Sequence, residues 1–157
     1  PEGAADLTFE ALADEPHSVI ARAGHPLASR ADLHYADLAR HGWILPPSDS
    51  VLRSRLDALF IEQGLPNPQN VIETSSLPVT TSLLRGSDLL AALPVESVAP
   101  YIQAKLLTVL PIDVGVRMES FGIIRRRGHS LPPAAERLLL ALRTTSRWLY
   151  PGLRGQG

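Results

Sequence analysis

WILPPSDS, at residues 43–50, is the first of two stretches that decide the fold of this chain, and VIETSS, at residues 71–76, is the second. Each begins as a short apolar strand, passes through a serine-rich turn and continues into an amphipathic helix, at 51–63 and 77–85 respectively. A strand–turn–helix unit that occurs twice in succession predicts parallel strands covered by helices. Both turns also place hydroxyls and unpaired backbone N–H groups at a helix N-terminus, an arrangement that favours a small anion.

Apolar spacing and turn residues predict the other elements of the core. In the 51–63 helix, Leu52, Leu56 and Phe60 share one face, and Gly64 is placed to end the helix in the left-handed conformation. The remaining elements are a short helix at 35–40, strands at 89–93 and 106–110, and a helix at 95–104. This alternation predicts an α/β protein with a mostly parallel sheet and helices on both faces.

Two longer strands, at 16–23 and 114–126, bracket this core. A chain that leaves one lobe and returns to it later produces such a pattern. The last predicted element is a helix at 133–148, whose first turn suits Pro133. Its residues expected to face inward are Ala134, Leu138, Leu142 and Thr145.

Composition places the chain among globular proteins. Hydrophobic residues make up 45% of its 157 residues, enough for one core or for one lobe and part of a second. The net charge of −1 excludes the basic footprint of a nucleic-acid-binding domain. Cysteine is absent from the sequence, which excludes disulfides and thiolate metal sites, and no apolar run approaches the roughly 20 residues of a membrane span. Residues 1–6 carry neither an initiator methionine nor a signal peptide, so we expect a piece of a longer protein.

The serine-rich turns are the candidate binding site. Ligands of open α/β sheets bind beyond the carboxyl ends of the strands, where Ser48, Ser50, Ser75 and Ser76 fall. Pro94-Val95, after the third strand, would complete the same rim. An alternative interpretation is that Ser50 and Ser76 only cap the helices that follow them.

Other chemistry finds little support in the sequence. The five histidines show no metal-ligand spacing, and no nucleophile elbow, phosphate-binding glycine loop or dinucleotide fingerprint is present. Ser75 or Ser76 would need a general base that the sequence does not supply. The run RRR at 125–127 is typical of a solvated strand edge, although it could also attract an acidic ligand or partner. We therefore expect no catalytic residues, no metal and no cofactor.

Several phrases carry a family resemblance through their order and spacing. They are RAGHPLA at 22–28, ADL at 36–38, WILPP at 43–47, SDLLAALP at 87–94 and LPPAAERLL at 131–139. Together they resemble the effector-binding domain of LysR-type bacterial transcriptional regulators, over nearly the whole chain. In the last phrase Pro132 stands where the family's closing helix often has serine, so the capping hydroxyl is absent there.

The resemblance implies a type-2 periplasmic-binding-protein fold, in which two Rossmann-like α/β lobes are joined by two crossing strands. Residues 25–112 would be the complete second regulatory lobe. Residues 1–24 would supply part of the first lobe and a crossing strand, residues 113–150 the return crossing and the closing helix of the first lobe, and residues 151–157 a frayed tail. Half of the first lobe and a winged helix-turn-helix that reads DNA would lie outside the chain.

The implied function is to sense a small, anionic effector in a cleft between the lobes. The second-lobe contacts of the family fall here on Pro47, Ser48, Ser50, Ser75, Ser76, Pro94 and Val95. Effector binding would favour one lobe arrangement and so control the absent DNA-binding domain. The family also implies a cytoplasmic homodimer or tetramer assembled through the regulatory lobes, with no membrane partner. Two alternatives remain open: a periplasmic solute-binding protein of the same fold, and an enzyme on an α/β scaffold.

Overall fold

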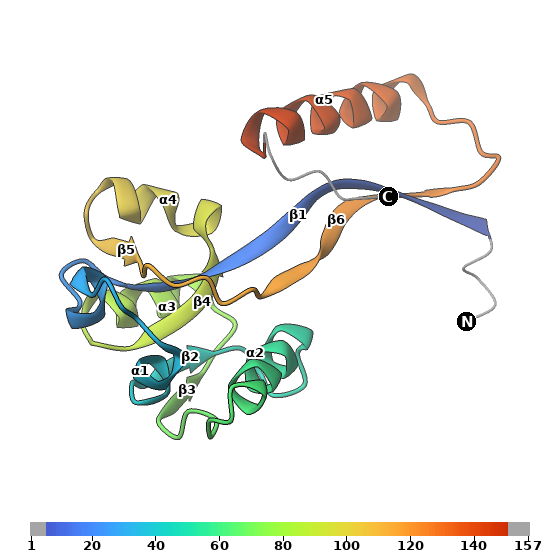
Figure 1. Ribbon diagram of the computed structural model, residues 1–157. Helices are drawn as coiled ribbons and strands as arrows, with labels where there is room; N and C mark the ends of the chain where they lie inside the picture. Colours follow the sequence, from blue (N-terminus) through green and yellow to red (C-terminus); the bar gives the residue numbers. More distant parts are fainter. Residues whose placement is uncertain (1–5, 151–157) are drawn as a thin grey trace. The chain divides into compact units, whose positions relative to one another are not determined.

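The computed structural model describes residues 6–150, which form two compact units (Figure 1). Unit 2 is Pro16–Val116, and unit 1 joins the chain up to Glu15 with the chain from Arg117 onward. The elements follow in the order β1 (Leu7–Arg22), the 3₁₀ helix η2 (Pro26–Ser29), α1 (Tyr35–Ala39), β2 (Trp43–Leu45), α2 (Val51–Glu62), β3 (Val71–Glu73), α3 (Leu77–Arg85), β4 (Leu90–Pro94), α4 (Val95–Gln103), β5 (Leu107–Val109), β6 (Arg117–Arg126) and α5 (Pro133–Leu149).

The sheet of unit 2 has the strand order β3-β2-β4-β1-β5. Strand β2 is parallel to both of its neighbours, with Trp43 opposite Val71 and Leu90. Strand β1 runs antiparallel to β4 and β5, with Ile20 opposite Ala91 and Val109. The predicted α/β class is confirmed, and the sheet is mixed because β1 runs against the strands on either side of it.

Two apolar clusters cover the two faces of this sheet. Side chains alternate between faces along a strand, so neighbouring residues of β1, β2 and β4 enter different clusters. One cluster contains Val19, Trp43, Leu45, Leu90 and Ala92 with Leu38, Leu56 and Phe60 of α1 and α2. The other contains Ile20, Ile44 and Ala91 with Leu84, Val98 and Leu107. Helices therefore pack on both faces, as the sequence predicts.

The ends of the helices follow local sequence signals. The Ser50 hydroxyl accepts a hydrogen bond from the Arg53 amide at 3.2 Å and caps α2, and Gly64 follows that helix at φ 68°, as predicted. Helix α4 ends differently, because Lys105 takes the left-handed position at φ 56°. The Leu106 amide then bonds back to the Tyr101 carbonyl at 2.9 Å, which closes the helix.

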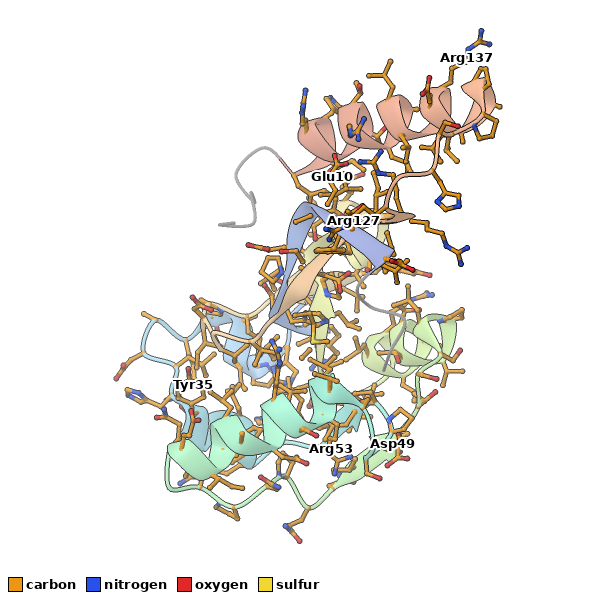
Figure 2. The ribbon with its side chains drawn as sticks, turned by 90° about the vertical axis from the view of Figure 1, so that its right-hand side faces the viewer. Glu10, Tyr35, Asp49, Arg53, Arg127 and Arg137 are labelled. Carbon is orange, nitrogen blue, oxygen red and sulfur yellow. The ribbon has the colours of Figure 1, made fainter. Side chains whose placement is uncertain are left out.

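Unit 1 is built on the amino half of β1 and on β6, which pair side by side (Figure 1). Helix α5 is held to β1 by polar contacts. The Arg143 guanidinium donates to both carboxylate oxygens of Glu10, at 2.6 and 2.7 Å, and lowers the pKa of that carboxyl. Glu10 is labelled in Figure 2. The buried Ser146 hydroxyl donates to the Leu12 carbonyl at 3.0 Å.

Two expectations about unit 1 are wrong in detail. Ala134, Leu138, Leu142 and Thr145 of α5 are exposed, and Ser146 is the buried residue of that helix. The return strand begins at Arg117 and not at Val114, because Gly115 turns the chain at φ 62° and the Val114 side chain belongs to the core of unit 2. Residues 151–157, predicted as a frayed tail, lie outside the described residues.

Candidate functional site

The carboxyl ends of β2, β3 and β4 meet at one edge of the sheet in unit 2. Leu45 lies opposite Glu73, and the Thr74 amide donates to the Leu45 carbonyl at 3.0 Å. On the other side of β2, Ile44 lies opposite Ala91. The turn after β2 and the turn after β3 are therefore neighbours, as their position in consecutive strand–turn–helix units predicts.

A cavity of about 190 Å³ opens at this edge. Three hydroxyl side chains, those of Thr74, Ser75 and Thr80, supply its polar groups. The rest of the wall is apolar and consists of Ile44, Leu45, Pro46, Leu52, Leu77, Ala91, Ala92 and Leu93. A mostly apolar hollow with a few convergent polar groups is the usual form of a small-molecule site.

The N-terminus of α3 lies beside the cavity, because its first residue, Leu77, is part of the wall. Ser76 occupies the N-cap position, but its side chain makes no capping hydrogen bond; its backbone amide donates to the Thr74 hydroxyl at 3.1 Å. The Thr80 hydroxyl donates to the Ser76 carbonyl at 3.1 Å, which fixes its orientation. The first-turn amides of a helix have no partner within the helix, so Leu77 and Val79 offer N–H donors here, whereas Pro78 has none, and the positive end of the α3 dipole lies at the same place.

The structure separates the predicted contact residues into two groups. Ser75 lines the cavity. Ser50 caps α2, and Ser48 is exposed in the turn before it. Pro94 is the N-cap residue of α4, and Val95 is its first residue. The residues outside the cavity wall are Pro47, Ser48, Ser50, Ser76, Pro94 and Val95. The capping interpretation thus holds for Ser50 but not for the Ser76 side chain.

Of the eleven lining residues, sequence reasoning predicted only Ser75, and four of the ten that it missed show how near the prediction came. Pro46, Thr74 and Leu93 directly precede Pro47, Ser75 and Pro94. Thr80 lies one helical turn after Ser76, so its hydroxyl returns to the same side of α3. A search for hydroxyl residues at positions i and i+4 around the turn would have found it.

The wall carries no ionisable side chain among the residues that the structure describes. Arg53, in the first turn of α2 (Figure 2), forms ion pairs with other residues: its Nε lies 3.0 Å from Asp57 Oδ2, and its Nη1 lies 3.7 Å from Glu73 Oε2. An anion in the cavity would therefore meet hydroxyls, backbone amides and the α3 dipole. Within residues 6–150, no group of three or more His, Asp or Glu side chains is arranged to hold a metal ion.

An α/β lobe with a ligand-sized cavity at the carboxyl ends of parallel strands defines the class of small-molecule-binding domains. The family model described as "LysR substrate binding domain" matches residues 1–147. The chain belongs to this family, whose regulatory domains have the type-2 periplasmic-binding-protein-like fold. No helix within residues 6–150 has the length and hydropathy needed to cross a membrane.

Relatives and solved structures agree with this assignment. The chain is 35% identical to the HTH-type transcriptional regulator GalR of Pseudomonas putida over 89% of its own length and 35% of the regulator's. It is 31% identical to GbpR of Azospirillum brasilense over 88% of its own length and 41% of that regulator's. The chain thus spans less than half of each of these curated relatives.

The fold is also that of the regulatory domain of Synechocystis PCC6803 CcmR in complex with 2-PG, with a TM-score of 0.73 and 23% identity over 94% of this chain and 70% of that one. The effector-binding domain of QuiR in complex with shikimate gives a TM-score of 0.65 and 20% identity over 96% of this chain and 70% of that one.

Proposed function

We propose that unit 2 binds the small-molecule effector of a LysR-type transcription factor in the cavity between the β2–α2 and β3–α3 turns. The observation that carries this proposal is the convergence of Thr74, Ser75 and Thr80 on one hollow beside the free N-terminus of α3. A cavity of about 150 Å³ can hold a benzene-sized molecule. The volume of about 190 Å³ therefore suits a small organic compound.

The effector proposed here is a small organic anion with an apolar body. Its carboxylate or similar group would accept hydrogen bonds from the Thr74 and Ser75 hydroxyls and from the first-turn amides of α3. The Thr80 hydroxyl, which donates its proton to the Ser76 carbonyl, would accept a hydrogen bond from a hydroxyl of the effector. Its apolar part would contact Pro46, Leu52 and Leu93. The neighbours bind 2-PG and shikimate, which are compounds of this size class, and this supports the choice. The other predicted contacts at the rim remain proposals: Pro47, Ser48, Ser50, Ser76, Pro94 and Val95.

In the whole regulator, unit 2 would act as the second regulatory lobe, and unit 1 would belong to the first. Large apolar side chains exposed on unit 1 support the view that further chain covers it; they include Phe9, Ile124, Leu138, Leu140 and Trp148. Effector binding would shift the population of lobe arrangements and so change how a homodimer or tetramer presents its DNA-binding domains. The regulator would act in the cytoplasm.

We also propose that the chain is not an enzyme. The relatives are named as transcriptional regulators, and Ser75 has no acid or base beside it in the cavity wall. A periplasmic solute-binding protein shares the fold, but the named relatives favour regulation.

Calorimetric titration of the chain with a panel of small hydroxylated carboxylates, shikimate included, tests this proposal. Thr80→Val removes a lining hydroxyl. Thr81→Val is the matched control, since Thr81 is also buried on α3 and its hydroxyl also donates to a first-turn carbonyl, that of Pro78, but it lies outside the cavity wall. For the compound that binds, Thr80→Val should weaken affinity by about 3- to 10-fold, because a hydroxyl of the compound loses its acceptor. Equal effects of the two substitutions would refute the proposed contact.

A further inference from the structure

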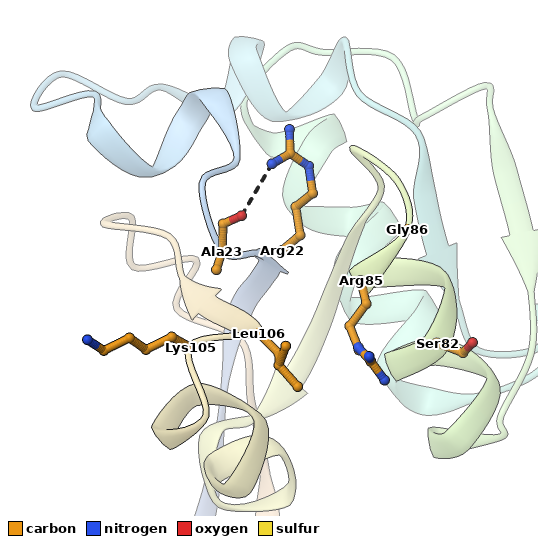
Figure 3. Close-up of a pocket in the computed structure, with 7 residues that line it drawn as sticks. All are labelled: Arg22, Ala23, Ser82, Arg85, Gly86, Lys105 and Leu106. Atoms are coloured by element: carbon orange, nitrogen blue, oxygen red, sulfur yellow. Dashed lines mark hydrogen bonds between the residues drawn. The ribbon is translucent and has the colours of Figure 1, made fainter.

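A second hollow lies at the opposite ends of the strands in unit 2. It measures about 520 Å³ and is lined by Arg22, Ala23, Ser82, Arg85, Gly86, Lys105 and Leu106 (Figure 3). Arg22 ends β1 and pairs with Leu107, the first residue of β5, while Arg85 and Gly86 precede β4. The hollow thus lies at the amino ends of β4 and β5, whereas the effector cavity lies at the carboxyl ends of β2, β3 and β4.

Three cationic side chains surround this hollow, and they are held to different degrees. The Arg22 Nε donates to Asp88 Oδ1 at 2.7 Å, and its Nη1 donates to the Ala23 carbonyl at 3.2 Å, which fixes the guanidinium. Arg85 and Lys105 make no hydrogen bond or ion pair with any residue in the part of the chain that the structure describes. In the view of Figure 3 they extend on either side of Leu106. Two long cationic side chains are therefore free to turn towards a ligand.

The positions of Arg85 and Lys105 at the ends of α3 and α4 are not explained by capping of these helices. Basic residues often bond the last carbonyls of a helix. At the end of α4, however, the backbone amides of Ala104, Lys105 and Leu106 already bond the carbonyls of Pro100, Ile102 and Tyr101. At the end of α3, the amides of Gly86 and Ser87 bond the carbonyls of Leu83 and Leu84. The charges of Arg85 and Lys105 are thus available for another purpose.

The backbone of Lys105 adds an independent observation. Its φ of 56° is the left-handed conformation, and Lys105 is the only non-glycine residue with a positive φ within residues 6–150. Glycine takes this position at a helix end without steric cost, whereas lysine does not. Strained backbone of this kind clusters at functional sites, and Lys105 lines the hollow.

We propose that this second hollow binds a small anion with two or more negative charges, such as a phosphate ester or a polycarboxylate. Three cations and no carboxylate belong to the described lining of this hollow, and Asp88 pairs with Arg22, so the site keeps a net positive charge. The Ser82 hydroxyl offers a further hydrogen bond. The site is separate from the effector cavity, so unit 2 would have two distinct ligand-binding sites.

Titration of the ¹⁵N-labelled chain with sodium pyrophosphate at low ionic strength tests this proposal, with backbone amide resonances as the readout. We expect saturable shifts at residues 82–86 and 104–106. The double variant Arg85→Gln/Lys105→Gln should lower affinity by about 10-fold or more, because two charge-assisted contacts are lost. Arg40→Gln, which removes an exposed cation outside the hollow, should change it by less than about 2-fold.

Lys105→Gly separates the charge from the fold, because glycine accepts the left-handed backbone and removes only the side chain. It should weaken pyrophosphate binding without lowering the melting temperature. Citrate in place of pyrophosphate distinguishes the two ligand sources: binding of citrate supports a polycarboxylate, and its failure while pyrophosphate binds supports a phosphate ester. Non-saturable shifts, equal binding of acetate, or equal loss in Arg40→Gln would overturn the proposal.

Discussion

His25 joins two turns of unit 2 through both of its ring nitrogens, and its replacement should destabilise this unit. The side chain is 2% exposed. Its Nδ1 accepts from the Leu27 amide at 3.1 Å, and its Nε2, which must then carry the proton, donates to the Asp88 carbonyl at 3.2 Å. The first bond caps η2, and the second ties η2 to the turn before β4.

The magnitude follows from these two bonds. His25→Ala leaves the Leu27 amide without a partner in a buried position, at a cost of about 1–3 kcal/mol, and removes the Asp88 bond, worth about 0.5–1.5 kcal/mol. We expect a loss of about 2–4 kcal/mol in the free energy of unfolding. In His25→Asn the side-chain oxygen can still accept from Leu27, but it cannot reach Asp88, so the loss should be about 1–2 kcal/mol.

Urea unfolding followed by tryptophan fluorescence measures this loss. The chain has two tryptophans, and Trp148→Phe removes the exposed one, so that the buried Trp43 reports on unit 2. His41→Ala is the matched control, because its ring is 5.0 Å from that of His25 but is only partly buried. A His25→Ala protein within about 0.5 kcal/mol of the parent would refute the assigned role.

The same residue predicts a pH dependence. Burial lowers the pKa of His25 in the folded protein, and the nearby His41 lowers it further, while the Asp88 carbonyl opposes the shift. Between this lowered value and about 6.5, the unfolded chain binds a proton that the folded chain does not. The free energy of unfolding should therefore fall as pH drops below about 6.5, and His25→Asn should lose part of this slope. An unchanged slope in the variant would contradict this reasoning.

Two further predictions concern unit 1. Gly122→Ala should destabilise it by about 1–3 kcal/mol, because a methyl group at this position would overlap the Glu10 carbonyl and the Phe9 ring. Thermal unfolding followed by circular dichroism measures the effect, and an unchanged melting temperature would show that the strand contact is wrong. Glu10→Gln should remove the stability that the Arg143 ion pair provides above about pH 4.5 and that is lost as pH falls through the lowered pKa of Glu10; the parent and the variant should differ at pH 7 and converge in acid.

Local sequence signals were sufficient to predict most of the helices and strands of unit 2. Periodicity of 3.6 residues, a capping serine and Gly64 define α2, and short apolar runs define β2 and β4. The amino half of β1 was not predicted, because its pairing partner is β6, more than 100 residues away, and because Asp14, Glu15 and Pro16 interrupt an ordinary strand pattern.

The buried side of α5 could not be read from periodicity, because burial depends on what lies against the helix. Arg143 and Ser146 contact β1, while most of its leucines are exposed within the described chain. The cavity lies at the strand ends where the sequence predicts the turns to meet, since parallel strands bring consecutive turns together. Which residue of a turn enters the cavity depends on the geometry of that turn. Thr74 therefore lines the cavity, whereas Ser76, which was predicted from its hydroxyl, lies outside the wall.

Amide chemical-shift mapping with the effector found by calorimetry tests the proposed effector site most directly. The proposed site predicts saturable shifts concentrated at residues 44–46, 74–80 and 91–93, with the Ser75 and Thr80 amides among the largest. Shifts confined to other parts of the chain, or saturable binding that leaves residues 74–80 unchanged, would contradict it.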